Sequence, residues 1–505
     1  MIDAVSLLSG PARTDRPIAP RGGARAGIGR DRAAFAAVAA IAGFALFLIL
    51  PFTLDDGDTG WHLATGAWIL AHGAVPVTDP FSFTAAGRAW VAHEWLSEVA
   101  MHLAYRLGGW SGLVLLFATA VAALYAIVAL HLSRWLGTPA AITALIAMTA
   151  GVLPSMLARP HLLALPLLAG WTVVMLAARA SGRRPGLGWA ALMVVWANAH
   201  GSFVLGLGLA AVFAAEHVVA APPRDRARVV REWATFGGLL LAAALATPAG
   251  LHALTFPFYV SDLALLSELS EWQPTSFRGI TAFEVVLLGT LFVLLVRPTR
   301  IPPFRLLILL GALHLTLQHT RQEIVLVVLG ALLLAEPIGS AFAARPRPCD
   351  TIGRRQAIAA LALFAAAATL LAAPRLAGPI ARPDAVTVPA TALRHVPAAV
   401  RGQAVFNDYS FGGALILAGM RPYIDGRSDM YGDAFTLDFF RILRGDAARW
   451  RRADRRWRFG WTILSPKARL ARMLDADPRW RVVYRDAVAV IHVRDAAPAT
   501  SRTRF

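Results

Sequence analysis

The chain has 505 residues, of which 57% are hydrophobic and only 16% are charged. Soluble proteins average roughly 25% charged residues, so this composition excludes an ordinary soluble protein and indicates a membrane protein with many helical spans. The formal charge of +18 comes almost wholly from arginine, but no basic and aromatic binding module accompanies it, and we expect no nucleic-acid partner. The single cysteine, Cys349, excludes an intrachain disulfide and any metal site built from several cysteines.

The chain begins with a basic segment, 1–32, followed by an apolar run at 33–54 that is long enough to cross a bilayer. A full-length span without a small-residue cleavage site indicates a cytoplasmic tail rather than a cleaved signal peptide. Similar apolar runs recur and predict an all-α domain at 33–373 with about eleven transmembrane helices. The further spans are expected at 110–132, 139–157, 161–178, 187–199, 201–221, 234–249, 280–297, 302–318, 322–340 and 356–373.

The spans at 187–199 and 201–221 form the least regular pair. Asn198, His200 and Gly201 interrupt them, so a broken or re-entrant hairpin is predicted there. Arginines concentrate in the loops that eleven spans place in the cytoplasm, as the positive-inside rule requires. The opposite loops contain only Arg88, Arg106, Arg159, Arg278 and Arg321.

An odd number of spans places the C-terminal part of the chain outside the cytoplasm. A linker rich in Pro and Ala, 374–400, leads to a predicted extracytoplasmic α/β domain at 401–505. Long domains cross the membrane largely regardless of charge, so the arginines of this domain do not contradict the assignment. Strands are expected at 404–407, 422–425, 461–465, 480–484 and 487–493, and helices at 435–443 and 468–474.

The first outer loop, 55–109, begins with the three carboxylates of Asp55, Asp56 and Asp58. Charge so close to lipid is costly, so it is more often functional than decorative. Asp58 and His62 are four residues apart and share one face of a helix. In the alternative interpretation, the first two aspartates simply end the membrane span.

Two amphipathic helices are predicted in this loop. The tryptophans of the first, 58–72, suit a helix that lies among the lipid headgroups. The second, 93–106, aligns Glu94, Glu98 and His102 on one face, which is either a solvated face or part of a site. His93 and Glu94 at its start would suit a metalloprotease motif, but the second histidine that this motif needs four residues after the first is absent. No metal ligands are assigned, although the histidines of the loop leave a divalent metal open.

The stretch from Asp58 to Gly66, together with Asp79-Pro-Phe-Ser82 and His93-Glu94-Trp95-Leu96, resembles a large group of poorly characterised bacterial polytopic membrane proteins. That group is similar to the GT-C glycosyltransferases, which include oligosaccharyltransferase, protein mannosyltransferases and aminoarabinose transferases. The similarity rests on many spans, an acidic motif directly after the first span and an outer C-terminal domain. The segment 423–432 is distinctive of the bacterial group.

The chain departs from the GT-C pattern in two places. The segment 406–413 loosely resembles the Trp-Trp-Asp-Tyr-Gly signature of oligosaccharyltransferase but lacks its tryptophans, so peptide recognition does not carry over. The outer loop at 157–161 has no carboxylate where several GT-C enzymes carry a second acidic residue, so metal coordination of the oligosaccharyltransferase kind is not expected. Glu271, in a later outer segment, is expected to bring a carboxylate into the same cavity.

The resemblance implies a membrane glycosyltransferase that moves a sugar from a polyprenyl-phosphate donor to a glycan, lipid or protein acceptor at the outer face of a bacterial inner membrane. The attacking hydroxyl needs a general base. Asp58 is the first choice and Asp56 the second, and His62 and Glu94 complete the candidate catalytic set. The leaving phosphate needs cations or hydrogen-bond donors. The candidate substrate-binding residues are Arg159, His161, Glu271, Arg278, Arg321, Asp425, Arg427 and Asp429.

Other interpretations stay open. Within 425–429, a solvated turn in which Arg427 pairs with a neighbouring aspartate explains the sequence equally well. A transporter or flippase of a lipid-linked or anionic solute suits a broken hairpin, and a non-catalytic scaffold for envelope assembly is a third reading. If the chain is an enzyme, we expect Asp58, Glu94, Glu271 and an arginine to converge on one outer cavity. If it is a scaffold, we expect these residues to lie apart.

Overall fold

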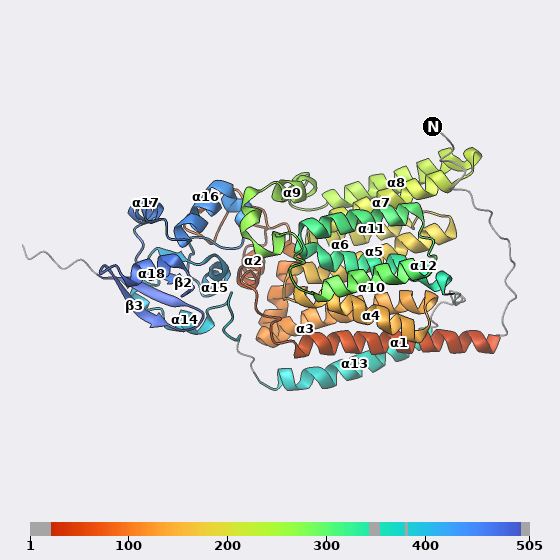
Figure 1. Ribbon diagram of the computed structural model, residues 1–505, viewed down its shortest axis with the longest axis horizontal. Coiled ribbons are helices and arrows are strands. Elements are labelled where there is room, and N and C mark those ends of the chain that lie inside the picture. The colour runs from red at the N-terminus through yellow and green to blue at the C-terminus, as the bar shows by residue number, and fades with distance from the viewer. Residues whose placement is uncertain (1–21, 343–353, 379–381, 496–505) are drawn as a thin grey trace, which may run out of the picture.

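The computed structural model describes residues 22–342, 354–378 and 382–495. The protein is mainly helical, with a bundle of long helices joined at one end to a smaller α/β region (Figure 1). Most of the predicted basic tail, Cys349 and the last residues of the chain lie outside the described residues.

Every predicted span coincides with a helix of the bundle. These helices are α1 (Gly22–Ile49), α3 (Trp95–Trp135), α4 (Thr138–Val152), α5 (Pro160–Ser181), α6 (Ala190–Ala199), α7 (Phe203–Ala220), α8 (Arg226–Leu245), α10 (Ala282–Val296), α11 (Pro303–Gln318), α12 (Glu323–Ala341) and α13 (Arg354–Leu376). Within the described residues, 7 helices are long and apolar enough to cross a membrane, whereas α6, α10 and α11 are shorter apolar helices. The chain is therefore a multi-pass membrane protein, and the predicted total of eleven crossings goes beyond what helix length and hydropathy support.

Two breaks in the bundle match irregular positions of the sequence. The long helix α3 is kinked at Gly108 and Gly109, where the φ of 59° at Gly109 is one that glycine adopts without strain. The kink separates the first arm of the helix, which begins at Trp95, from its longer apolar part. Helices α6 and α7 are separated at His200, and the Asn198 side-chain amide donates to the carbonyls of Val194 and Ala246 at 2.8 Å each. This break is therefore closed by hydrogen bonds inside the protein.

The helix α2 (Thr59–His72) lies between the bundle and the C-terminal region (Figure 1). Its Trp61, Thr65 and Ile69 are buried, and the helix packs mainly on α3 and on α15 (Gly412–Leu417). The prediction that this face lies among lipid headgroups was wrong, because the C-terminal region covers it.

Glycines let α2 and α15 meet at backbone contact. A Cβ on Gly60 would overlap the carbonyl of Gly413, and a Cβ on Gly413 would overlap the carbonyl of Gly57. Only a residue without a side chain allows so close an approach. The crossing holds the C-terminal region directly against the acidic motif that precedes α2.

The C-terminal region contains a 4-stranded sheet in the order β1-β2-β4-β3. Strand β1 (Val405–Asn407) pairs in parallel with β2 (Trp461–Leu464), and β4 (Val490–Arg494) pairs antiparallel with β2 and with β3 (Trp480–Arg485). The helices of this region are α14 (Ala390–Arg394), α15, α16 (Ser428–Leu443), α17 (Ala447–Trp457) and α18 (Arg469–Asp475). Four of the predicted strands and both predicted helices are thus present.

Residues 422–425 do not form the predicted strand. The Asn407 side chain takes the place of a neighbouring strand, because its amide donates to the Ile424 carbonyl and its oxygen accepts the Tyr423 N–H, both at 2.8 Å. Helix α17 was not predicted, although Asp446 at its start accepts two backbone N–H groups of its first turn.

The segment between α8 and α10 also connects the bundle to the C-terminal region. It comprises α9 (His252–Ser261), η4 (Ala264–Glu268) and η5 (Ser270–Trp272). The Asp433 carboxylate of α16 accepts the N–H groups of Ala264 and Leu265 at 3.1 and 2.8 Å. These bonds fix the segment that carries Glu271.

Candidate functional site

Three segments at the end of the bundle that faces the C-terminal region meet around one arginine. Asp56 and Asp58 precede α2, Arg159 precedes α5, and Glu271 lies in η5. Arg159 Nε lies 2.7 Å from Asp56 Oδ1, and Nη1 lies 2.6 Å from Glu271 Oε2. Arg159 Nη2 pairs with Asp58 Oδ2. Each guanidinium nitrogen therefore meets a different carboxylate.

The acidic turn is closed by its own side chains. Asp56 Oδ2 accepts the Thr59 hydroxyl at 3.1 Å, and Asp56 Oδ1 accepts the Asp58 N–H at 3.3 Å. Asp58 Oδ1 lies against Gly426 of the C-terminal region, where any Cβ would overlap it. The Asp58 carboxylate is therefore confined between Arg159 and the backbone of the loop that follows residue 425.

The cluster remains partly open. The side chains of Asp58 and Arg159 are each 21% exposed, and that of Glu271 is 38% exposed. Arg321 adds a second cation at the rim, since its Nη1 lies 3.4 Å from Glu271 Oε1 and its guanidinium lies 4.4 Å from the centre of the Trp272 ring. The side chains of both arginines are therefore partly exposed.

Burial and charge set the protonation of the two outer carboxylates. Burial raises the pKa of Asp58 to about 6, against the opposing effect of Arg159. Burial also pushes the pKa of Glu271 upward, but Arg159 and Arg321 outweigh it and hold that pKa at about 2. Both carboxylates are thus ionised at neutral pH, and Asp58 is the one that can take up a proton near neutrality.

Glu94 stands beside this cluster at the start of α3. Burial raises its pKa to about 8, although Arg321 and Arg159 act in the opposite direction. Burial lowers the pKa of the neighbouring His200 well below its usual range, so that ring is neutral. His200 Nδ1 accepts the Ser202 N–H at 3.0 Å, which assigns the ring proton to Nε2, 3.4 Å from Glu94 Oε1. Glu94 is therefore mainly protonated at neutral pH.

His62 lies behind the cluster. Its Nδ1 is 3.2 Å from Glu98 Oε1, and both side chains are buried. Burial, with a contribution from Arg159, lowers the pKa of His62 well below its usual range. The ring also lies against Trp61, with 3.6 Å between ring centres. These contacts suit a residue that positions the first turn of α2.

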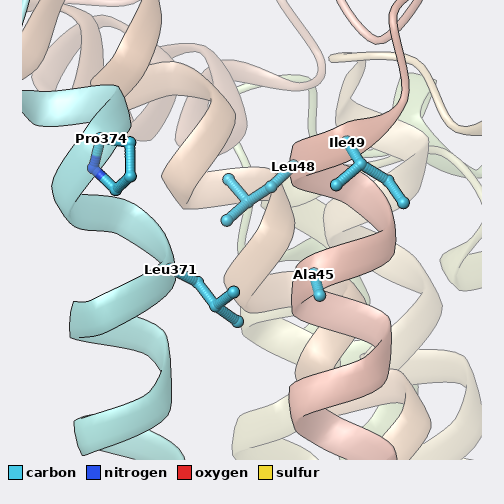
Figure 2. Close-up of a pocket in the computed structure, with 5 residues that line it drawn as sticks. All are labelled: Ala45, Leu48, Ile49, Leu371 and Pro374. Atoms are coloured by element: carbon cyan, nitrogen blue, oxygen red, sulfur yellow. The ribbon is translucent and has the colours of Figure 1, made fainter.

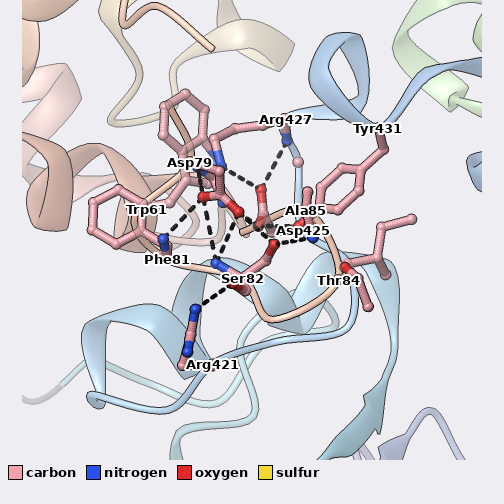
Figure 3. A network of polar contacts seen from close by, with 12 residues as sticks. Trp61, Asp79, Phe81, Ser82, Thr84, Ala85, Arg421, Asp425, Arg427 and Tyr431 are labelled. Carbon is pink, nitrogen blue, oxygen red and sulfur yellow. Dashed lines mark hydrogen bonds and ion pairs between the residues drawn. The ribbon is translucent and has the colours of Figure 1, made fainter. Parts of the chain in front are cut away.

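Asp425 and Arg427 belong to a closed network that Figure 3 shows. Arg427 is 1% exposed, and it donates to Asp425 through Nε at 2.8 Å and Nη2 at 2.7 Å. Its Nη1 donates to Asp79 Oδ1 of the first outer loop at 2.7 Å, and the Tyr431 hydroxyl donates to Asp425 at 2.8 Å. The geometry favours the internal ion pair over ligand contact, and the network ties the first loop to the C-terminal region.

The remaining candidates differ in position. Asp429 is partly buried, and burial raises its pKa to about 6 against the effect of Arg427. His161 Nε2 is 2.9 Å from the Ser155 carbonyl, in the turn that carries Arg159. Arg278 is exposed and joins no ion pair within the described part of the chain, so the structure does not bring it to the cluster.

The comparisons with known proteins concern the fold. No family model and no curated protein matches the sequence. The crystal structure of the Archaeoglobus fulgidus oligosaccharyltransferase in the apo form is similar, with a TM-score of 0.50 and 11% sequence identity over 85% of this chain and 69% of that one. The chain has a GT-C-like fold. The resemblance predicted from the sequence is thereby confirmed at the level of architecture.

A divalent cation does not fit the acidic cluster of this GT-C-like chain. Oxygen ligands lie about 2.0–2.6 Å from a magnesium or calcium ion, but the Arg159 guanidinium fills the space among the carboxylates of Asp56, Asp58 and Glu271. Across the described residues, no group of three or more histidine, cysteine, aspartate and glutamate side chains is arranged to hold a metal ion. We therefore derive no step through a metal.

Sequence reasoning missed Arg382, which lies in the linker. Its Nε donates to the Leu54 carbonyl at 3.1 Å and its Nη2 to the Asp56 carbonyl at 2.5 Å. Burial lowers its pKa to about 10. Nothing in the spacing of the linker marks this arginine. The closeness of Gly426 to Asp58 was also missed, although a glycine within an Asp-Gly-Arg turn is a signal of close approach.

An apolar hollow of about 310 Å³ lies between the ends of α1 and α13 (Figure 2). The residues that line it are Ala45, Leu48, Ile49, Leu371 and Pro374. The chain that leaves α1 and the chain that leaves α13 meet again at the bond between Asp56 and Arg382.

Proposed function

We propose that the chain is a membrane glycosyltransferase that moves a sugar from a polyprenyl-phosphate donor to a glycan, lipid or protein acceptor at the outer face of a bacterial inner membrane. The observation that carries the proposal is the meeting of Asp58, Glu271, Arg159 and Arg321 in one partly open cluster of a GT-C-like fold. The transferase hypothesis predicts that these residues converge, whereas the scaffold hypothesis predicts that they lie apart.

In the proposed orientation the N-terminus lies in the cytoplasm and the α/β domain, 401–505, lies outside. The arginine asymmetry of the loops supports this orientation. The cluster then faces the compartment in which an outward-facing lipid-linked donor presents its head group. The hollow between α1 and α13 offers an apolar surface for the first part of the prenyl chain.

Asp58 acts as the general base of the transfer. It takes the proton of the acceptor hydroxyl, whose oxygen attacks the anomeric carbon while the bond to the lipid phosphate breaks. The phosphate leaves next to Arg321 and Arg159, which stabilise its charge. Asp56 is held by hydrogen bonds and by Arg159, so the second-choice base serves to hold the turn.

Glu94 supplies a hydrogen-bond donor rather than a base. Its pKa of about 8 keeps it protonated at neutral pH, and His200 Nε2 lies 3.4 Å from its Oε1. A protonated carboxyl in a cleft beside an ionised one is a common division of acid and base roles. Glu94 therefore stabilises the donor sugar or phosphate by donation.

The test is a transfer assay on protein in lipid nanodiscs, with radiolabelled polyprenyl-phosphate sugars and membrane extract as the acceptor source. Asp58→Asn should lower the rate by roughly 10²–10⁴-fold. Asp55→Asn is the matched control, because Asp55 accepts the Thr387 hydroxyl at 2.6 Å and belongs to a different contact. Equal rates for the two variants would show that Asp58 is not the base.

The same assay separates the alternatives. If label stays on the lipid with every donor tested, the transferase proposal fails. Labelled lipid that instead changes leaflet in a parallel accessibility assay would identify a flippase. If the label neither leaves the lipid nor changes leaflet, the non-catalytic scaffold is the interpretation that remains.

A further inference from the structure

Arg159 occupies the place that a cluster of carboxylates ordinarily leaves to a metal ion. Carboxylates at one point repel one another, so they remain ionised together only around positive charge. Here the three nitrogens of one guanidinium meet Asp56, Asp58 and Glu271 separately. Although burial opposes its charge, these carboxylates hold the pKa of Arg159 well above its usual range. The charge at the centre is therefore a permanent part of the chain.

Positive charge already surrounds the cluster. Arg321 contacts Glu271 from the rim. The buried Arg382 donates to the Asp56 backbone carbonyl and interacts with the charges of Asp56 and Asp55. Three arginines therefore already offset much of the negative charge of this turn. A divalent cation bound to the same oxygens would place further positive charge against Arg159, which like-charge repulsion disfavours.

We propose that Arg159 is the built-in cation of this site and that sugar transfer by this chain requires no divalent metal. The inference rests on the proposed function. A guanidinium carries five N–H groups. Nη1 donates one hydrogen to Glu271 and Nη2 one to Asp58, while Nε forms an ion pair with Asp56, so Nη1 and Nη2 each carry a second hydrogen. This pair matches two oxygens of a phosphate. A lysine at this position would offer a point charge and would lose that match.

The reaction balances without another reactant. The acceptor oxygen forms a bond to the anomeric carbon, and its proton passes to Asp58. The bond between the anomeric carbon and the phosphate oxygen breaks, and its electron pair leaves with the lipid phosphate. Arg159 and Arg321 meet the charge that develops on that oxygen, which is the part a metal ion plays in other phosphate-releasing sites.

The first experiment uses wild-type protein in nanodiscs after dialysis against EDTA. The transfer rate should equal that of untreated protein, and added Mn²⁺ should leave it unchanged. Titration of the same protein with Mn²⁺, followed by electron paramagnetic resonance, should show only the free ion. Transfer that EDTA abolishes and Mn²⁺ restores, with a bound-ion signal that Glu271→Gln removes, would overturn the proposal.

The second experiment measures transfer by variants of Arg159. Arg159→Ala should lower transfer by roughly 10²–10³-fold, as for loss of a charge-stabilising donor, and Arg159→Lys should recover part of that loss because it restores the charge alone. Arg106→Ala is the matched control, since Arg106 is an exposed arginine of α3 that belongs to no candidate site. A folded Arg159→Ala protein with the wild-type rate would contradict the inference.

The two failures are distinguishable. Absence of transfer under all conditions, with and without metal, would refute the proposed function. The Mn²⁺ titration needs no activity, so it still decides whether the cluster binds a divalent cation. A bound-ion signal lost in Glu271→Gln would then count against Arg159 as the resident cation, and a free-ion signal would support it.

Discussion

Replacement of Arg427 by methionine should destabilise the joint between the first loop and the C-terminal region by about 3–5 kcal/mol, the usual cost of removing one partner from a buried ion pair. The change removes both side-chain bonds to Asp425 and the single bond to Asp79. Methionine keeps most of the apolar stem, so the packing under the Trp90 ring, 4.7 Å from the guanidinium, is largely retained. The loss is therefore electrostatic.

The remaining contacts show why the charge is not compensated. Asp79 keeps the Ser82 hydroxyl at 2.5 Å and the Phe81 N–H at 2.9 Å, and Asp425 keeps the Tyr431 hydroxyl at 2.8 Å. These donors are neutral, and two buried carboxylates would face each other without a cation. One of the two carboxylates can take up a proton, which removes the repulsion between them. The expected loss of unfolding free energy therefore lies within the range for a broken buried ion pair and not above it.

The measurement is denaturant unfolding followed by tryptophan fluorescence, with Arg444→Met as the control. Arg444 is 60% exposed and pairs with Glu268, so its loss should cost less than about 1 kcal/mol. Adding Asp79→Asn and Asp425→Asn to Arg427→Met should recover much of the loss, because no charge is then buried unpaired. If Arg427→Met is no less stable than Arg444→Met, the network does not hold the joint.

Two further predictions concern the open cluster and the helix crossing. Transfer should rise as pH increases through about 6, where Asp58 loses its proton, and should fall above about 8, where Glu94 loses the proton that it donates; a pH–rate profile of Glu94→Gln that still falls at high pH would contradict the second role. Gly60→Ala should separate α2 from α15 and speed proteolytic release of the C-terminal region, whereas Gly402→Ala, with open space around its Cβ, should not; equal release rates would count against the backbone contact.

Most of the helical fold was predictable because a membrane span is a local signal. An apolar run of sufficient length specifies a helix whatever its neighbours are, so every predicted span coincides with a helix. The number of crossings does not follow from this signal alone, because α6, α10 and α11 are short apolar helices. The incorrect predictions concern features that tertiary contacts determine. The buried face of α2 depends on α15, and the strand expected at 422–425 is replaced by hydrogen bonds to one asparagine side chain.

The candidate site was predictable to the extent that its chemistry lies in one motif. The acidic turn after the first span pointed to Asp58, and the scarcity of outer arginines pointed to Arg159. Their roles stay a prediction, but the structure places them in contact. The contribution of Arg382 was not predictable, because a linker arginine acquires a partner only when the chain returns to the turn after residue 54.

The two arginine networks show why sequence pattern alone could not separate structure from chemistry. Arg159 pairs with two aspartates and one glutamate, and Arg427 pairs with two aspartates. In both networks the carboxylates come from more than one segment. They differ in exposure, which is 21% for Arg159 and 1% for Arg427. A closed network has its charges satisfied internally and can only hold segments together. An open network with unused N–H groups can exchange part of its pairing for a substrate anion, so Arg159 is the arginine on which transfer activity should depend.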